Sequence, residues 1–359
     1  MLHYNSDPNV ALDGENGTPS VSVLMPCLNE SKYLRGCLES LLLNDYRGQF
    51  EITVIDGGST DGTLEIIHKF CASDRRVKML ANPRRTAPTA LNLAIPQASG
   101  EVIVRVDAHA LYPTNYISRC VTALLESGAA NVGGVWRIVP GLPTKLGWTV
   151  AKVQANRFGV GNAAYRLGNL TERRWVDTVP FLCCRKTLFG EIGYFNPELT
   201  RTQDIEFNRR IRNAGGGILL CPEIEITYFA RAELGSMALH AWKTGLWIIL
   251  PFLYSDVVPI SWRHLMPLIF LTSLIVTGLA SIFTSTALVL FGVIIAAYAS
   301  CALLASIQIA VREKDFAYVL WAPLVFATFH ISYGLGSLWG VWRLAAEMYR
   351  TRKLVPRGA

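Results

Sequence analysis

The run VSVLMPCLNE at residues 21–30 decides the fold, because the chain uses the same pattern three times. In each case a short apolar run ends at a polar cluster, and the other two are EITVIDGGSTDG at residues 51–62 and VIVRVDAH at residues 102–109. Short β-branched runs bounded by turn residues are typical of buried strands in a parallel sheet. Ligands of open α/β sheets bind beyond the carboxyl ends of the strands. The three runs therefore predict one binding site at that edge.

Strand-like and helix-like patterns alternate over residues 20–230, which indicates an α/β domain with a mixed, mainly parallel sheet. A first helix is predicted with Asn29 or Ser31 as its N-cap and an apolar face of Leu34, Leu38, Leu41 and Leu42. Further helices are predicted from Thr63 and at 87–98, 114–127 and 205–214. Further strands are predicted at 133–138, 218–221 and 224–228, and residues 137–176 are predicted to be irregular. The expected catalytic domain covers residues 20–235.

The C-terminal third is nearly free of charge. Between residues 265 and 342 the only charged side chains are the cluster Arg312–Asp315. The stretches 265–283, 286–311 and 316–342 are each long enough to cross a bilayer, which needs about 20 apolar residues per helix. They predict three transmembrane helices, and the alternative is a set of buried core helices.

Residues 236–264 mix tryptophans with cations, which predicts amphipathic helices in the membrane interface, broken at Pro251. The topology contains a conflict. Three spans place Arg312 on the cytoplasmic side, as the positive-inside rule asks, but place the basic tail at 344–359 outside. Either the last segment re-enters near Gly334, or the number of spans is wrong by one.

Charge and cysteine content restrict the class of protein. The chain has 359 residues and a net charge of +7, which suits anionic lipid or phosphates but is too diffuse to indicate nucleic acid. Residues 1–19 are polar and predict a disordered arm without a secretory signal, so the catalytic domain is expected in the cytoplasm.

Eight cysteines without a Cys-x-x-Cys pair indicate reduced thiols. Residues 354–358 look like a protease-site remnant of an expression vector.

Four side chains carry the predicted chemistry. Asp56 ends the second run at a glycine-rich turn and is suited to accept hydrogen bonds from a base or ribose, although it could simply form the turn. Asp107 and His109 can point at one ion, since carboxylate and imidazole suit Mn²⁺ or Mg²⁺ when phosphates complete the shell. A structural hydrogen bond is the alternative for His109. Asp204 precedes a helix and is either a functional acid or an N-cap.

These pieces together resemble the inverting glycosyltransferases of family 2, which have the nucleotide-sugar-binding fold called GT-A. The matching segments are Val21–Glu30, Val54–Thr63, Ala98–Glu101, Asp107–His109 and Gln203-Asp204. Segments 176–179, 190–193 and 228–247, with the Asp-Ala-His motif and the apolar tail, are similar to bacterial exopolysaccharide transferases of the succinoglycan β-1,3-glucosyltransferase type.

The resemblance implies a function. A UDP-hexose such as UDP-glucose would be the donor, and a hydroxyl of a polyprenyl-diphosphate-linked saccharide would be the acceptor, at the bacterial inner membrane. The resemblance assigns the nucleotide-sugar contacts to Pro26, Leu28, Glu30, Asp56, Asp107, Asp177 and Arg231. Asp107 and His109 would hold the metal, and Asp204 would be the general base of a single inverting displacement.

The chain departs from the family pattern at three positions. Gly57 stands where a second acid is common, His109 replaces an acid, and Gln203 replaces the glutamate before the base. The chain also has no Gln-x-x-Arg-Trp element after Asp204, so transfer of one sugar per encounter is expected. The alternatives are a polyprenyl-phosphate glycosyltransferase, a processive polysaccharide synthase, and an inactive nucleotide-binding membrane adaptor.

Overall fold

The computed structural model describes residues 17–257 and 260–354, which divide into two compact units. Unit 1 runs to Arg137 and resumes over Gly168–Tyr228; unit 2 comprises Ile138–Leu167 and the chain from Phe229. Residues 1–16 of the arm predicted over 1–19, and residues 355–358 of the predicted vector remnant 354–358, lie outside the described residues.

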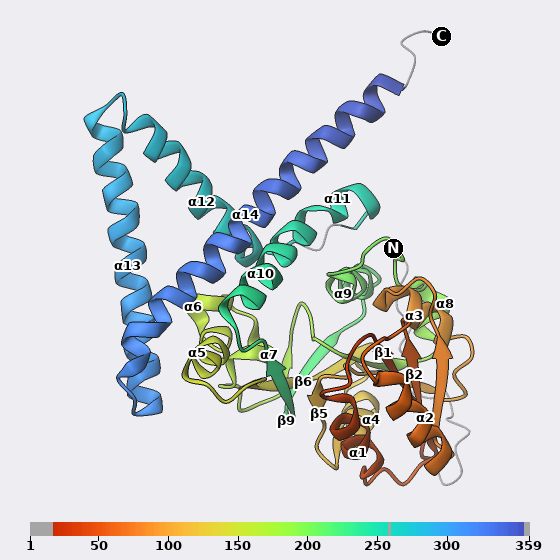
Figure 1. The fold of residues 1–359 in the computed structure, drawn as a ribbon. Helices are drawn as coiled ribbons and strands as arrows, with labels where there is room; N and C mark the ends of the chain where they lie inside the picture. Colours follow the sequence, from red (N-terminus) through yellow and green to blue (C-terminus); the bar gives the residue numbers. More distant parts are fainter. Residues whose placement is uncertain (1–16, 258–259, 355–359) are drawn as a thin grey trace. The chain divides into compact units, whose positions relative to one another are not determined.

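A five-stranded sheet in the order β3-β2-β1-β4-β8 forms the centre of unit 1 (Figure 1). The strands are β1 Val21–Cys27, β2 Phe50–Asp56, β3 Val77–Ala81, β4 Val102–Arg105 and β8 Leu182–Arg185. β1 to β4 are parallel, as predicted, and β8 joins β4 antiparallel. Because Cys27 pairs with Asp56 in register, the polar clusters after β1, β2 and β4 reach the same edge of the sheet.

Helices flank this sheet through apolar faces. They are α1 Leu34–Leu42, α2 Thr63–Ser73, α3 Ala87–Ala94, α4 Tyr116–Ser127, α8 Leu188–Ile192 and α9 Gln203–Asn213. In α1 the buried positions are Leu34, Cys37, Leu38 and Leu41, which share one face at helical spacing. α3 ends at Ala94 rather than at residue 98, shortly before Pro96, which lacks an N–H to continue the helix. All eight cysteines are free thiols, as predicted.

A second sheet has the order β5-β9-β6, with β7 also paired to β9. Its strands are β5 Ala110–Leu111, β6 Asn131–Pro140, β7 Arg174–Trp175 and β9 Ile218–Ala230. Two short strands were expected where β9 is one continuous strand, and that expectation is wrong. β9 stays extended through Pro222 because β7 pairs it at Leu219–Leu220 and β5 pairs it at Thr227–Tyr228, on either side of the proline.

Unit 2 is helical. It contains α5 Lys145–Gln154, α6 Arg157–Val160, α7 Ala164–Leu167, α10 Leu234–Ile249, α11 Pro251–Tyr254, α12 Trp262–Ala280, α13 Ser285–Glu313 and α14 Ala317–Leu354. Residues 137–176 are therefore not irregular as expected. Val150 and Val153 of α5 are buried in a cluster with Ile309 of α13 and Phe326 of α14, and this partner was not visible in the local sequence. For the same reason residues 138–167 group with the C-terminal helices, within the segment expected to be one catalytic domain.

The expected break at Pro251 is confirmed, since α10 ends at Ile249 and α11 starts at the proline. Three helices of the described chain are long and apolar enough to cross a membrane: Trp262–Ala280, Ser285–Glu313 and Ala317–Arg350. They correspond to the three predicted segments.

Candidate active site

Asp56 closes the turn that follows β2. Its Oδ2 accepts hydrogen bonds from the N–H groups of Gly58 (2.8 Å) and Ser59 (3.0 Å), and its Oδ1 accepts one from the Ser59 hydroxyl (2.5 Å). Asp56 as a whole is only 4% exposed. Much of its hydrogen-bonding capacity thus shapes the glycine-rich turn, which leaves fewer lone pairs for a ligand than the sequence suggested.

The turn after β1 is bound to the turn after β2. The N–H of Asn29 donates to the Ser59 hydroxyl (2.8 Å), and the N–H of Ser31 donates to Asp61 (3.1 Å). Hydrogen bonds from the Thr63 hydroxyl and from Ser31 lower the pKa of Asp61 to about 2. Asn29 has a left-handed backbone (φ +55°), which asparagine tolerates better than most residues. This arrangement holds Glu30 at the sheet edge.

Two buried side chains hold the backbone of Asp107 in place. The N–H of Asp107 donates to the Tyr112 hydroxyl (2.8 Å), and the Cys37 thiol donates to the Asp107 carbonyl oxygen (3.5 Å). Tyr112 and Cys37 are both buried. The carboxylate is therefore carried on a fixed backbone just past the end of β4.

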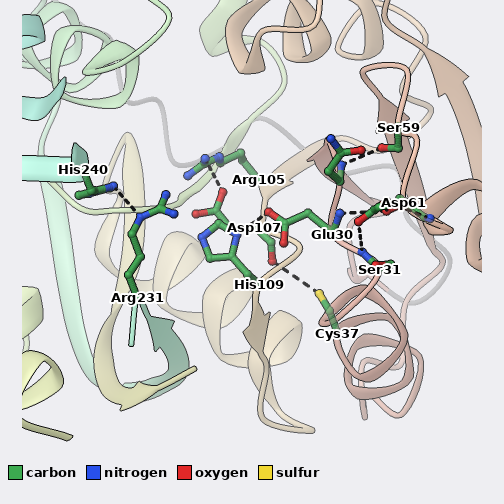
Figure 2. A network of polar contacts seen from close by, with 12 residues as sticks. Glu30, Ser31, Cys37, Ser59, Asp61, Arg105, Asp107, His109, Arg231 and His240 are labelled. Atoms are coloured by element: carbon green, nitrogen blue, oxygen red, sulfur yellow. Dashed lines mark hydrogen bonds and ion pairs between the residues drawn. The ribbon is translucent and has the colours of Figure 1, made fainter. Parts of the chain in front are cut away.

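Arg105, the last residue of β4, is the cation of the site (Figure 2). Its guanidinium donates to the Asp107 carboxylate at 2.5 Å and to the Pro180 carbonyl oxygen at 2.9 Å, and its side chain is only 12% exposed. Burial alone would lower the pKa of Arg105, but the carboxylates of Asp107 and Asp204 raise it above its ordinary value. Arg105 thus couples two acids that are distant in sequence.

Asp204 lies in the first turn of α9 and is partly buried. Burial raises the pKa of its carboxyl above the usual value, while Arg105 and the N–H of Ile205 counteract this. A carboxylate whose pKa is raised is a stronger proton acceptor than an ordinary aspartate. Arg105, Gln203 and Asp204 line one pocket, whose apolar wall includes Leu91, Phe195 and Phe207. The Gln203 Oε1 is buried and accepts no hydrogen bond from the described residues.

His109 is oriented by Glu30. The Nδ1 of His109 lies 2.9 Å from the Glu30 carboxylate, and Figure 2 shows the pair beside Asp107 and Arg105. A carboxylate on Nδ1 selects the tautomer with a proton there, which leaves the lone pair on Nε2. The His109 ring meets Tyr228 edge-on at 5.4 Å, and Trp136 stacks on Tyr228 at 4.0 Å. The imidazole is therefore held on two sides.

Asp107 and His109 are the candidate donors for a divalent cation, which they could hold only together with a ligand. Within residues 17–257 and 260–354, no group of three or more His, Cys, Asp or Glu side chains could hold a metal alone. Asp107 and His109 provide one oxygen and one nitrogen donor, and the Glu30–His109 hydrogen bond is the outer-shell contact that metal-binding histidines usually have. Diphosphate oxygens would have to complete the coordination.

The other predicted residues are distributed as follows. Pro26 pairs in register with Ile55, and Leu28 is 38% exposed at the same edge. Asp177 is partly buried and precedes Thr178, whose hydroxyl accepts a hydrogen bond from Asn208 of α9. Arg231 belongs to unit 2, where its Nε donates to the Nδ1 of His240 at 3.2 Å. Unit 1 thus brings the other predicted residues to one edge of the sheet and to α9, and Arg231 is not part of that unit.

Sequence reasoning missed two features of this site. Arg105 was assigned to a strand without a functional role. A lone cation in the buried run VIVRV is a usable signal, since such a cation needs a partner. The Glu30–His109 hydrogen bond joins residues 79 positions apart, and no local pattern indicates it.

The architecture of the two sheets and their flanking helices is that of the GT-A fold. The complex of mannosyltransferase PcManGT from Pyrobaculum calidifontis with GDP-Man and Mn²⁺ has the same fold, with a TM-score of 0.56 and 19% identity over 91% of this chain and 88% of that one. Residues 22–188 match the family model "Glycosyl transferase family 2".

Two curated relatives extend this assignment. The succinoglycan biosynthesis protein ExoA of Rhizobium meliloti is 30% identical over 59% of this chain and 64% of its own length. A dolichyl N-acetyl-α-D-glucosaminyl phosphate 3-β-D-2,3-diacetamido-2,3-dideoxy-β-D-glucuronosyltransferase of Methanococcus voltae is 24% identical over 88% of this chain and 95% of its own. The chain thus spans slightly less than two thirds of ExoA and nearly all of the archaeal relative.

Proposed function

We propose that this protein is a membrane-bound inverting glycosyltransferase that moves one sugar from a nucleoside-diphosphate sugar to a hydroxyl of a polyprenyl-linked saccharide. The observation that carries the proposal is the series Asp107–Arg105–Asp204: the Arg105 guanidinium pairs with Asp107 after β4, and it lines one pocket with Asp204 of the first turn of α9, whose charge it feels. Arg105 and Asp204 line one pocket, and Asp107 pairs with the same Arg105, which supports a diphosphate-binding role for Asp107 and a base role for Asp204.

In the proposed reaction Asp204 takes the proton of the acceptor hydroxyl as its oxygen attacks the anomeric carbon. The bond from that carbon to the diphosphate oxygen breaks on the opposite side, so the configuration inverts and no protein nucleophile is needed. The raised pKa of Asp204 suits this role, because the base must hold a proton briefly. The free Oε1 of Gln203 provides an acceptor for a sugar hydroxyl in the same pocket.

The donor is proposed to be a UDP-hexose. Pro26, Leu28 and Glu30 after β1, with Asp56 after β2, would surround the nucleoside, and Asp177 would contact a sugar. Arg231 is proposed to meet the diphosphate. Asp107 and the Nε2 of His109 would hold Mn²⁺ or Mg²⁺, which when bound offsets negative charge on the leaving diphosphate. Glu30 would keep the imidazole oriented for that contact.

A lipid-linked acceptor is supported by two observations. Three helices of the described chain are apolar enough to cross a membrane, and the archaeal relative that aligns over most of both chains is named for a dolichyl-phosphate-linked sugar acceptor. We place the protein at the bacterial inner membrane with the catalytic domain, within residues 20–235, in the cytoplasm. Confinement to the membrane would raise the local concentration of the acceptor and restrict its approach.

The test is a donor and acceptor panel with the purified, detergent-solubilised chain. We expect a UDP-hexose to be consumed with Mn²⁺, and expect Asp204→Asn to lower kcat by at least about 100-fold while donor binding persists. Asp45→Asn, at an exposed carboxylate, is the matched control and should keep full activity. Full turnover by Asp204→Asn would instead support a phosphate acceptor, which needs no base. Long products would indicate a processive synthase, and absence of nucleotide binding would contradict the donor assignment.

A further inference from the structure

α14 differs from the other two long apolar helices in how much of it is covered. Of its most apolar stretch, 39% is buried within the protein, compared with 6% for α12 and 11% for α13. Apolar residues such as Val276 and Leu279 of α12 and Val289 of α13 are widely exposed, as expected for helices that face lipid on most sides. In contrast, one side of α14 packs against other parts of the protein along much of its length.

The cover over the second half of α14 is α10. Gly336 and Gly340 of α14 lie against the backbone of α10, where a Cβ would collide with the carbonyl oxygen of Trp242 or press on Ile249. The Ser337 hydroxyl donates to the Gly245 carbonyl oxygen of α10 at 3.2 Å. Small residues allow such close helix approach. α10 also carries an exposed Lys243, and a cation at that position is costly within hydrocarbon.

The beginning of α14 is fixed to the side of the membrane that holds α5. Asp315, just before α14, pairs with Lys145 of α5, and Glu313 pairs with Lys152 of the same helix at 2.7 Å. α5 lies between β6 and β7 in the chain, so it remains on the side of the N-terminal domain. The turn from α13 to α14 must therefore be on that side too.

The middle of α14 is fixed to the same side by the beginning of α12. A Cβ on Gly334 would lie 2.6 Å from the Pro267 carbonyl oxygen, which is in the second turn of α12. That part of α12 follows directly from α10 and α11 and carries Arg263, whose guanidinium donates to the Asn162 side chain at 3.2 Å. A charged and hydrogen-bonded helix start marks the headgroup region rather than the hydrocarbon.

These two fixed points determine how α14 lies. Ala317 and Gly334 are about 26 Å apart along a helix that rises 1.5 Å per residue, which is close to the thickness of the hydrocarbon core. If α14 crossed the bilayer, Gly334 and the start of α12 would reach the far face, and α12 would have nothing left to cross. If α14 instead lies along the surface of the bilayer, the start of α12 and the end of α13 are both at the headgroups. The charged Arg263 at the start of α12 and Glu313 at the end of α13 require that position.

The lengths of the helices agree with the second arrangement. α12 has 19 residues and α13 has 29, or about 28 Å and about 43 Å, and Figure 1 shows them as two sides of a triangle whose third side is α14. Each of these two helices is about as long as the hydrocarbon core is thick (about 30 Å) or longer, so each can cross it.

We propose that only α12 and α13 cross the bilayer, and that α14 lies with α10 along the headgroup face on the side of the N-terminal domain. The partner of α14 is then the lipid surface, which it meets through an exposed apolar stripe. The stripe consists of Leu320, Leu324, Ile331, Leu335, Trp339 and Trp342, spaced three, four or seven residues apart. Arg312, Arg343 and Arg350 then lie on one side, and the conflict with the positive-inside rule disappears.

Protease accessibility of tags tests the topology on the full chain in oriented membrane vesicles. Tags at the N-terminus and C-terminus should be cleaved from the same side, while Phe283→Cys at the exposed α12–α13 turn should react with a membrane-impermeant maleimide only from the other side. The parent chain, with its eight native cysteines, is the labelling control. Terminal tags on opposite sides, or a turn on the same side as both tags, would overturn the proposal.

Membrane depth provides a second measurement that needs no activity. Spin labels at Leu320, Leu324 and Leu335 of α14 should report one depth close to the headgroups. Labels at Leu288, Val293 and Leu304 of α13 should report depths that pass through the bilayer centre. A depth that changes steadily along α14, with its middle at the bilayer centre, would show that α14 is a third span. Neither readout depends on the proposed reaction.

Discussion

Glu51 at the start of β2 offers a stability prediction that can be worked from the structure. Its Oε1 accepts hydrogen bonds from the Ser22 hydroxyl (2.6 Å), the Ser99 N–H (2.9 Å) and the Ser99 hydroxyl (2.8 Å), and its Oε2 accepts one from Lys78 (2.5 Å). The carboxylate thus joins β1, β2, β3 and the turn before β4 at the edge opposite the site. Replacing it by glutamine keeps the shape and removes the charge.

The size of the effect follows from the pKa of Glu51. Burial alone would raise it, but hydrogen bonds from Lys78, Ser22 and Ser99 lower it from 4.5 to about 2. At 1.36 kcal/mol per unit, the ionised carboxylate stabilises the folded state by about 3 kcal/mol. Lys78 is 59% exposed, so its share is screened and contributes at most about 1 kcal/mol. Glu51→Gln should therefore lower the free energy of unfolding by about 2–3 kcal/mol at pH 7.

The pH dependence identifies the cause. Because the folded-state pKa is lowered, this stabilisation is complete above the unfolded-state pKa near 4.5 and disappears as the pH falls towards 2. Thermal unfolding in detergent should show a Tm deficit of roughly 5–10 °C for Glu51→Gln at pH 7, which falls by about half by pH 3. Lys78→Met is the control, with a much smaller loss. An equal deficit at both pH values would refute the electrostatic explanation.

Three further predictions concern the site and the helices. Arg105→Gln should move the acid limb of the kcat profile to higher pH, because Arg105 lowers the pKa of Asp204; a limb that moves to lower pH would contradict this coupling. Glu30→Gln should weaken Mn²⁺ binding in the presence of UDP by about 10–100-fold, measured by electron paramagnetic resonance titration, since it loosens His109; unchanged affinity would remove Glu30 from the metal site. Gly336→Leu should lower stability by more than about 3 kcal/mol, since its side chain has no room against α10; a Tm equal to that of the parent would show that the helices are not in contact.

Much of unit 1 could be predicted from local sequence. The runs at residues 21–30, 51–62 and 102–109 specify three parallel strands and their common polar edge, because strand preference and turn residues act over a few positions. The helix at residues 34–42 follows from its leucine spacing, and the apolar segments after residue 265 follow from their length. Asp107 could be placed at the site because it directly follows a strand whose direction was evident.

Only the tertiary structure decided the contacts between distant segments. A hydrogen bond from His109 to Glu30, the electrostatic interaction of Arg105 with both Asp107 and Asp204, and the packing of α5 on α13 each depend on where the chain returns. The same is true of α14, whose composition equals that of a membrane span but whose glycines fit the backbone of α10. Apolar composition measures the cost of contact with water and does not say whether protein or lipid replaces that water. The sequence therefore determined which surfaces must be covered, and the fold determined what covers them.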